Sequence, residues 1–348
     1  MLFNKEINAM ISYFDAHCDT VYRCMETGEA SALEYGESRE EQRRYYAASG
    51  HLRKNGGHID LERGRQFRRC AQFFALFHDA AEAPADGMWA QCQRMHDFFL
   101  REMADNADIA RHCRTGAEVD EAVAQGKVAA LLSIEGADLI DCDVHRIETV
   151  AGWGVRLLNP VWNRANVLSG TNAEEPERGL SAEGRDFIRV MEEYGIYPDV
   201  SHLSDAGFWD LVRMARRPII ASHSNARAIC PHRRNLTDDQ FRAIRDLGGV
   251  VGLNLYLHFV GESTMDALVA HVEHFLALGG EKTLCLGGDM DGCEALAGGM
   301  TGMQDMPKLY DALKARGYGE ELLEDIFWNN LRCLSLWKGG IYGTVRNG

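Results

Sequence analysis

The stretch ISYFDAHCDTVY, residues 11–22, joins an apolar run to a pair of metal-capable side chains. Side chains alternate between the two faces of an extended strand, so His17 and Asp19 are predicted to point one way and Cys18 the other. An imidazole and a carboxylate that share one face can bind a metal ion. By themselves they can equally form a polar strand end in contact with water.

Eight short apolar runs of this kind recur along the chain, and amphipathic stretches separate most of them. The runs cover residues 9–17, 70–77, 127–135, 154–162, 196–202, 218–223, 248–256 and 283–289. Several are almost continuously apolar, which is typical of parallel strands covered on both faces. Residues that favour helix starts and stops flank the amphipathic stretches: Ser204-Asp205, Thr237-Asp238-Asp239, Gly195, Gly248 and Gly279-Gly280.

This alternation of strands and helices predicts an α/β protein with one domain over residues 1–348. The predicted fold is a (β/α)8 TIM-type barrel, and a doubly wound open sheet is the structural alternative. The longest irregular stretch, at about residues 26–66, is expected to form an excursion over one end of the barrel, between the first and second strands.

Composition and net charge limit the classes of partner and the cellular location that are expected for this chain. The net charge is −15, which disfavours a nucleic-acid backbone or an anionic membrane surface as partner. Ten cysteines are scattered without a CxxC pair, so they are expected to be buried thiols in a reducing compartment rather than a zinc finger or a disulfide framework. No signal peptide or run of about 18 apolar residues is visible. A cytoplasmic location is therefore expected.

Metal-capable side chains end five of the eight runs, which is hard to obtain from core packing alone. They are His17, Asp19, Glu135, His202, His223 and Asp289. A barrel enzyme builds its active site at the carboxyl ends of its strands, so these groups are expected to meet. A set of imidazoles and carboxylates without thiolate suits zinc, and it suffices for two ions if one carboxylate bridges them. Such a pair of ions points to hydrolysis.

Seven motifs, taken in order along the chain, resemble those of the membrane (renal) dipeptidase family of zinc peptidases. They are DAHCDT (15–20), SIEGAD (133–138), GVRLLNPVWN (154–163), DVSHLS (199–204), SHSNARAICPHRRNLTDDQ (222–240), GGVVGLNLY (248–256) and LGGDMDG (286–292). This family lies within the amidohydrolase-like metal barrels. The resemblance implies two Zn²⁺ ions per chain, one held by His17 and Asp19, the other by His202 and His223, with Glu135 as the bridge.

The same resemblance implies roles for the surrounding residues. Asp289 would act as proton shuttle, Arg234 would receive the terminal carboxylate of the substrate, and Tyr256 would line the pocket. One position departs from the family, since Trp162 stands where animal members carry a substrate-contacting histidine. Tryptophan has one N–H donor and no basic nitrogen, so a pocket-wall role is expected for it.

The expected activity is therefore hydrolysis of dipeptides by a metal-bridging hydroxide. Two alternatives remain open: a related amidohydrolase that cleaves N-acyl amino acids or lactams, which Trp162 motivates, and a metal-bound binding protein without catalysis. A small peptide is the expected partner. The family often forms dimers, so a homodimer is a further possibility that the resemblance implies.

Overall fold

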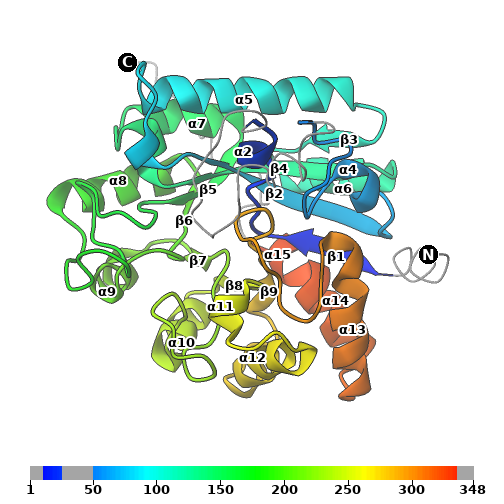
Figure 1. Cartoon of the computed structure of the whole chain (residues 1–348). Helices are drawn as coiled ribbons and strands as arrows, with labels where there is room; N and C mark the ends of the chain where they lie inside the picture. Colours follow the sequence, from blue (N-terminus) through cyan, green and yellow to red (C-terminus); the bar gives the residue numbers. More distant parts are fainter. Residues whose placement is uncertain (1–10, 26–49, 335–348) are drawn as a thin grey trace.

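The computed structural model describes residues 11–25 and 50–334, and eight of its parallel strands form a nearly closed barrel surrounded by helices (Figure 1). The strands are β1 (Ser12–Asp15), β2 (Arg69–Phe77), β3 (Ala110–His112), β4 (Val128–Glu135), β5 (Val155–Asn159), β6 (Tyr197–Pro198), β7 (Ile220–Ala221), β8 (Val250–Leu253) and β9 (Leu284–Leu286). Their order is β6-β5-β4-β2-β1-β9-β8-β7. A parallel bridge between Asp199 and Ile220 links the two ends of this order and brings the barrel close to closure.

The helices pack around this barrel, as Figure 1 shows. The α-helices are α2 (Thr20–Met25), α4 (Leu61–Gly64), α5 (Met88–Asp105), α6 (Gly116–Ala124), α7 (Arg146–Trp153), α8 (Ala182–Glu193), α9 (Asp205–Met214), α10 (Asp238–Asp246), α11 (Leu257–Val260), α12 (Met265–Ala277), α13 (Met306–Ala315), α14 (Glu320–Glu324) and α15 (Asn330–Arg332). Short helical turns are η1 (Ala80–Glu82), η2 (Ala137–Ile140), η3 (Met303–Asp305) and η4 (Asp325–Asn329), the last a π-helical turn.

The predicted barrel is thus confirmed, and so are the expected helix boundaries. The hydroxyls of Ser204 and Thr237 cap the first turns of α9 and α10. Gly195, Gly248 and Gly279 follow α8, α10 and α12 with positive φ angles of 74°, 72° and 80°. Glycine adopts this left-handed conformation without steric cost, which is why these helices end there.

The sequence did not predict β3, which pairs with the first half of β4 and lies off the main strand order. Within the predicted excursion, residues 26–49 lie outside the described residues. The described part, residues 50–66, contains α4, whose first turn is capped by the carboxylate of Asp60.

Two apolar layers hold the strands in place. One buried cluster takes side chains from all eight barrel strands, among them Phe14, Leu131 and Ile220, as expected for the packed interior of a barrel. Trp328, from η4, belongs to the same cluster and its ring centroid lies 5.4 Å from that of Phe14. The second cluster lies between the strands and the helices. With its interior filled, the barrel leaves room for a site only beyond its strand ends.

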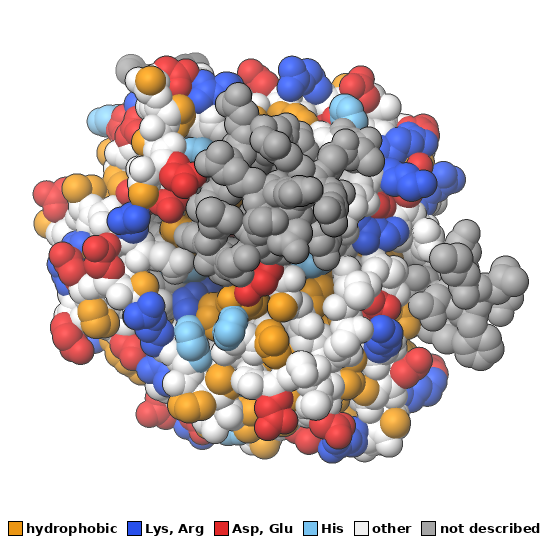
Figure 2. Space-filling view, viewed as in Figure 1, with side chains coloured by type: hydrophobic (Ala, Val, Ile, Leu, Met, Phe, Trp, Pro, Cys, Tyr) orange, Lys and Arg blue, Asp and Glu red, His pale blue; other side chains and the backbone are white. Residues whose placement is uncertain are grey.

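Acidic and basic side chains are interspersed over the face shown in Figure 2, and no continuous basic patch forms among the described residues visible there. Among the residues that the structure describes, no helix combines the length and the apolar character that a membrane crossing requires. None of the cysteines at the ten positions is bonded to another.

Candidate metal centre

The polar residues that follow the strands meet at one end of the barrel, where they are buried. His17 and Asp19 follow β1, Glu135 ends β4, and the others follow β6, β7 and β9: His202, His223 and Asp289. The alternation predicted for the opening stretch holds. The Nε2 atom of His17 lies 3.2 Å from Oδ2 of Asp19, while Cys18 belongs to the apolar cluster outside the barrel.

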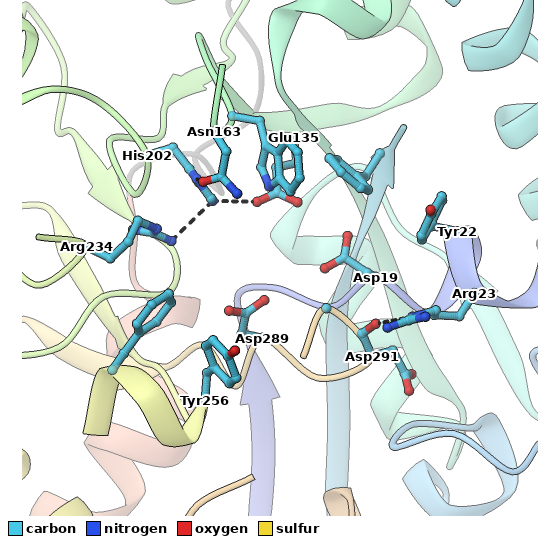
Figure 3. Close-up of a pocket in the computed structure, with 14 residues that line it drawn as sticks. Asp19, Tyr22, Arg23, Glu135, Asn163, His202, Arg234, Tyr256, Asp289 and Asp291 are labelled. Atoms are coloured by element: carbon cyan, nitrogen blue, oxygen red, sulfur yellow. Dashed lines mark hydrogen bonds and ion pairs between the residues drawn. The ribbon is translucent and has the colours of Figure 1, made fainter. Parts of the chain in front are cut away.

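Glu135 lies at the centre of this group, and its two carboxylate oxygens face different partners. Oε2 lies 3.5 Å from Nε2 of His17. Oε1 lies 2.8 Å from Nε2 of His202 and 3.5 Å from Nε2 of His223 (Figure 3 shows the first of these contacts). The carboxylate therefore stands between one group formed by His17 and Asp19 and another formed by the two later histidines.

Two buried aspartates fix the backbone that carries these side chains. Asp15 accepts hydrogen bonds from the N–H groups of His17 and Gly288, each at 2.9 Å, and so ties the ends of β1 and β9 together. Asp199 accepts from the N–H groups of Ser201 and Ser222 at 3.1 and 3.0 Å, which ties the ends of β6 and β7 together. Each aspartate thus aligns two segments of the candidate site.

The imidazoles of His202 and His223 are oriented from behind. Nδ1 of His202 lies 3.1 Å from Oδ1 of Asn163, and Nδ1 of His223 lies 2.7 Å from Oγ of Ser222. When Nδ1 carries the proton, Nε2 keeps its lone pair, which is the form that binds a metal. The two Nε2 atoms face each other at 3.1 Å.

Burial and neighbouring charges set the protonation of the centre. Burial raises the pKa of Glu135 to about 8, against the opposing effect of His17. Burial also raises the pKa of Asp289. It lowers the pKa values of His202 and His223 well below the usual range, with help from Arg234 and His17, so both are neutral. His17 goes the other way, because Glu135 and Asp19 outweigh burial and raise its pKa well above the usual range.

These residues fit divalent metal ions. Oδ1 of Asp19 is buried and no described residue donates a hydrogen bond to it, which is costly unless a cation binds there. Two groups have ligand atoms within 4.8 Å of one another: His17 with Glu135 and His223, and His17 with Asp19 and Asp289. Nitrogen and oxygen donors without thiolate match zinc or a similar transition metal.

A pocket opens onto this centre, with about 610 Å³ of empty space that includes its opening to solvent. The structure brings all three predicted pocket residues into its lining, namely Arg234, Tyr256 and Trp162. One guanidinium nitrogen of Arg234 lies 3.2 Å from Nε2 of His202, and its Cζ lies 5.2 Å from the ring centroid of Phe259. The Trp162 ring packs against Phe77, with centroids 4.7 Å apart.

Several lining residues were not among the predicted site residues. They are Tyr22, Arg23, Phe77, Asn163, Phe259, Asp291 and Gly292. Asn163 is adjacent to Trp162 within the motif already singled out, and Asp291 and Gly292 belong to LGGDMDG. The two aspartates that tie the strand ends stand two and three residues before predicted ligands, in DAH and DVSH. The short spacing between these aspartates and the predicted ligands is the feature of the sequence that could have indicated their role.

Comparison with known proteins identifies the family. The model for membrane dipeptidases (peptidase family M19) matches residues 1–336. An uncharacterised Klebsiella pneumoniae protein from the 5′ region of pqqA is 34% identical over an alignment of 270 residues that covers 73% of this chain and 98% of that protein.

Two solved structures are similar throughout. A Rhodobacter sphaeroides metallopeptidase, liganded with a phosphinate mimic of the dipeptide L-Ala-D-Ala, is 26% identical with a TM-score of 0.78, covering 94% of this chain and 99% of that one. A dipeptidase of family M19 is 27% identical with a TM-score of 0.79, covering 94% and 98%. The chain therefore belongs to the membrane dipeptidase family, peptidase family M19, and is a metal-dependent hydrolase.

Proposed function

We propose that this chain is a binuclear zinc dipeptidase. In this proposal His17 and Asp19 hold one ion, His202 and His223 hold the other, and Glu135 bridges them. The observation that carries it is the placement of Glu135, whose two oxygens face the two groups at 2.8 to 3.5 Å. When bound, the two ions supply a hydroxide nucleophile at neutral pH and polarise the amide carbonyl.

Asp289 is proposed to carry the proton to the leaving amine. Its Oδ2 accepts a hydrogen bond from Nδ2 of Asn254 at 2.9 Å, which fixes the carboxylate at the edge of the centre. Oδ1 lies 3.9 Å from Nε2 of His17. Burial raises the pKa of Asp289, and a carboxyl group with a raised pKa can both take up and release a proton during turnover.

Arg234 is proposed to bind the terminal carboxylate of the substrate. A guanidinium presents paired donors that match a carboxylate, and the face of Phe259 supports it from one side. Because Arg234 contacts His202 directly, the carboxylate that it binds lies within one residue of the metal centre. This spacing selects dipeptides over longer peptides.

Tyr256 and Trp162 are proposed to shape the rest of the pocket. The phenol of Tyr256 donates a hydrogen bond to Glu294 at 3.2 Å, which fixes the ring in the lining of the pocket. Trp162 and Phe77 form an apolar wall next to Glu135. The phosphinate dipeptide mimic in the Rhodobacter sphaeroides relative supports a substrate of dipeptide size.

The ten unbonded cysteines support a reducing, cytoplasmic location.

The proposal is tested with purified enzyme and three substrate series: dipeptides, the same dipeptides with an amidated C-terminus, and N-acyl amino acids or lactams. We expect hydrolysis of dipeptides and a large loss on amidation, because the amide removes the charge that Arg234 recognises. The third series is included because Trp162 stands where animal members of the family carry a substrate-contacting histidine. Hydrolysis of acyl or cyclic amides with no turnover of any dipeptide would reject the dipeptidase in favour of a related amidohydrolase.

A further inference from the structure

Asn163 is a polar residue in the pocket whose amide group is only half used by the protein. Its Oδ1 lies 3.1 Å from Nδ1 of His202, and the residue lines the pocket beside Trp162. No described residue accepts a hydrogen bond from its amide nitrogen, Nδ2. In Figure 3 this nitrogen is turned toward the pocket, while the oxygen faces His202.

The neighbours of His202 fix which way the amide is turned. In the proposed centre Nε2 of His202 would hold a metal ion and therefore keeps its lone pair, which leaves the proton on Nδ1. A protonated Nδ1 needs an acceptor, and only the oxygen of the Asn163 amide can supply it. The two N–H bonds of Nδ2 are therefore left for whatever occupies the pocket.

The loop that carries Asn163 is held rigidly against the same histidine. The backbone carbonyl of Asn163 accepts a hydrogen bond from Oγ of Thr171 at 3.1 Å. The adjacent N–H of Asn172 donates to the carbonyl of His202 at 3.1 Å. The loop between β5 and α8 thus holds both the ring and the backbone of His202, and Asn163 is fixed before any substrate arrives.

From this geometry we infer that Asn163 is a catalytic residue with two hydrogen-bond functions: its Oδ1 orients His202, and its Nδ2 donates to the carbonyl oxygen of the scissile amide as negative charge develops there. The inference rests on the proposed dipeptidase function. A fixed donor of this kind stabilises the transition state more than the ground state, so it acts mainly on kcat.

Two variants separate the two functions. Asn163→Asp keeps an acceptor for Nδ1 of His202 and removes the donor. Asn163→Leu removes both and adds no charge. We expect Asn163→Asp to retain the metal content of the wild type while its kcat falls about 100-fold, in the range seen for removal of one donor to an oxyanion. Asn163→Leu should lose bound metal on dialysis and keep the same kcat deficit when excess zinc is restored.

Trp162→Phe removes the other N–H donor on this wall and serves for comparison, and its kcat should fall much less than that of Asn163→Asp. Wild-type kcat in Asn163→Asp would overturn the inference. Full recovery of Asn163→Leu by zinc would overturn it as well, since Asn163 would then only orient His202. An inactive wild type on all dipeptides would instead reject the proposed function, which keeps the two failures distinguishable.

Discussion

At the scale of single residues, the site depends on carboxylates that the fold keeps buried and close together. Asp19, Glu135 and Asp289 lie within one cluster of ligand atoms around His17. Like charges this close repel one another unless cations lie between them. The cluster is therefore stable with metal bound and costly without it. The metal-free protein keeps this unfavourable cluster of carboxylates because metal binding requires them to be close together.

Asp289 gives a direct prediction. Asp289→Asn preserves the shape of the side chain, and asparagine tolerates the positive φ of 55° at this position. The amide cannot relay a proton, so kcat should fall by roughly 100- to 10,000-fold. Steady-state kinetics and metal analysis on the same preparation check this. A variant with normal turnover, or one that has lost its metal, would remove the proton-shuttle role.

Gly292 gives a second prediction, since a Cβ atom there would lie 2.3 Å from Oδ2 of Asp19 and 2.5 Å from Oδ1 of Asp289. Gly292→Ala should therefore displace both carboxylates and lower metal content and activity together. Gly152→Ala is the matched control, because its Cβ would meet no atom within 4 Å. If Gly292→Ala bound metal as tightly as this control, the crowded geometry would be refuted.

The six strand-end residues could be named from the sequence because each ends an apolar run, a local pattern. Asn163 could not be named in this way. Its importance comes from the packing of its loop against His202, which is 39 positions later in the chain. Glycine at position 292 likewise matters only because Asp19 approaches it from the far end of the sequence.

At the scale of elements, helices and strands were predictable where caps and apolar periodicity agree. Strand β3 was missed because Ala110–His112 is short and two of its three residues are polar. Its place beside β4 is fixed by tertiary pairing rather than by its own sequence. Strands β6 and β7 are short in the same way, with two residues each. Asp199 connects the ends of these two strands by accepting a hydrogen bond from the N–H of Ser222.

His271 connects helix α12 to helix α11 and to the loop at Ala226, and it predicts a pH dependence of stability. From α12, its Nδ1 accepts from the N–H of Ala226 and its Nε2 donates to the carbonyl of Val260, each at 3.1 Å. Burial lowers its pKa from 6.5 to about 4. Because the folded protein holds this imidazole neutral, the stability it contributes is full above pH 6.5 and is lost as pH falls toward 4.

Measuring the free energy of unfolding of the metal-free wild type and of His271→Gln between pH 7 and pH 4 checks this. Glutamine is neutral throughout. The variant should be less stable at pH 7, and the difference should narrow by roughly 3 kcal/mol as pH falls. A difference that stays constant over this interval would contradict the pKa assigned to His271.

At the scale of the whole molecule, the barrel gathers the residues of the proposed site from five strand ends that are far apart in the sequence. Its interior is filled by side chains and its helices cover the outside, so catalysis is confined to one end. Removal of metal should therefore lower the stability of the entire domain. Ligands that bind only the folded state stabilise it, and we expect a chelator to lower the Tm as well as the activity.

The proposed function depends on a two-metal centre bridged by Glu135, and metal analysis combined with a dipeptide assay can detect that centre. The measurement takes the metal-to-protein ratio and the rate of dipeptide hydrolysis before chelation, after chelation, and after titration with zinc. We predict a ratio near two, loss of activity on chelation, and recovery that is complete only near the second equivalent. Full activity at one equivalent, or activity that survives chelation, would contradict a two-metal centre bridged by Glu135.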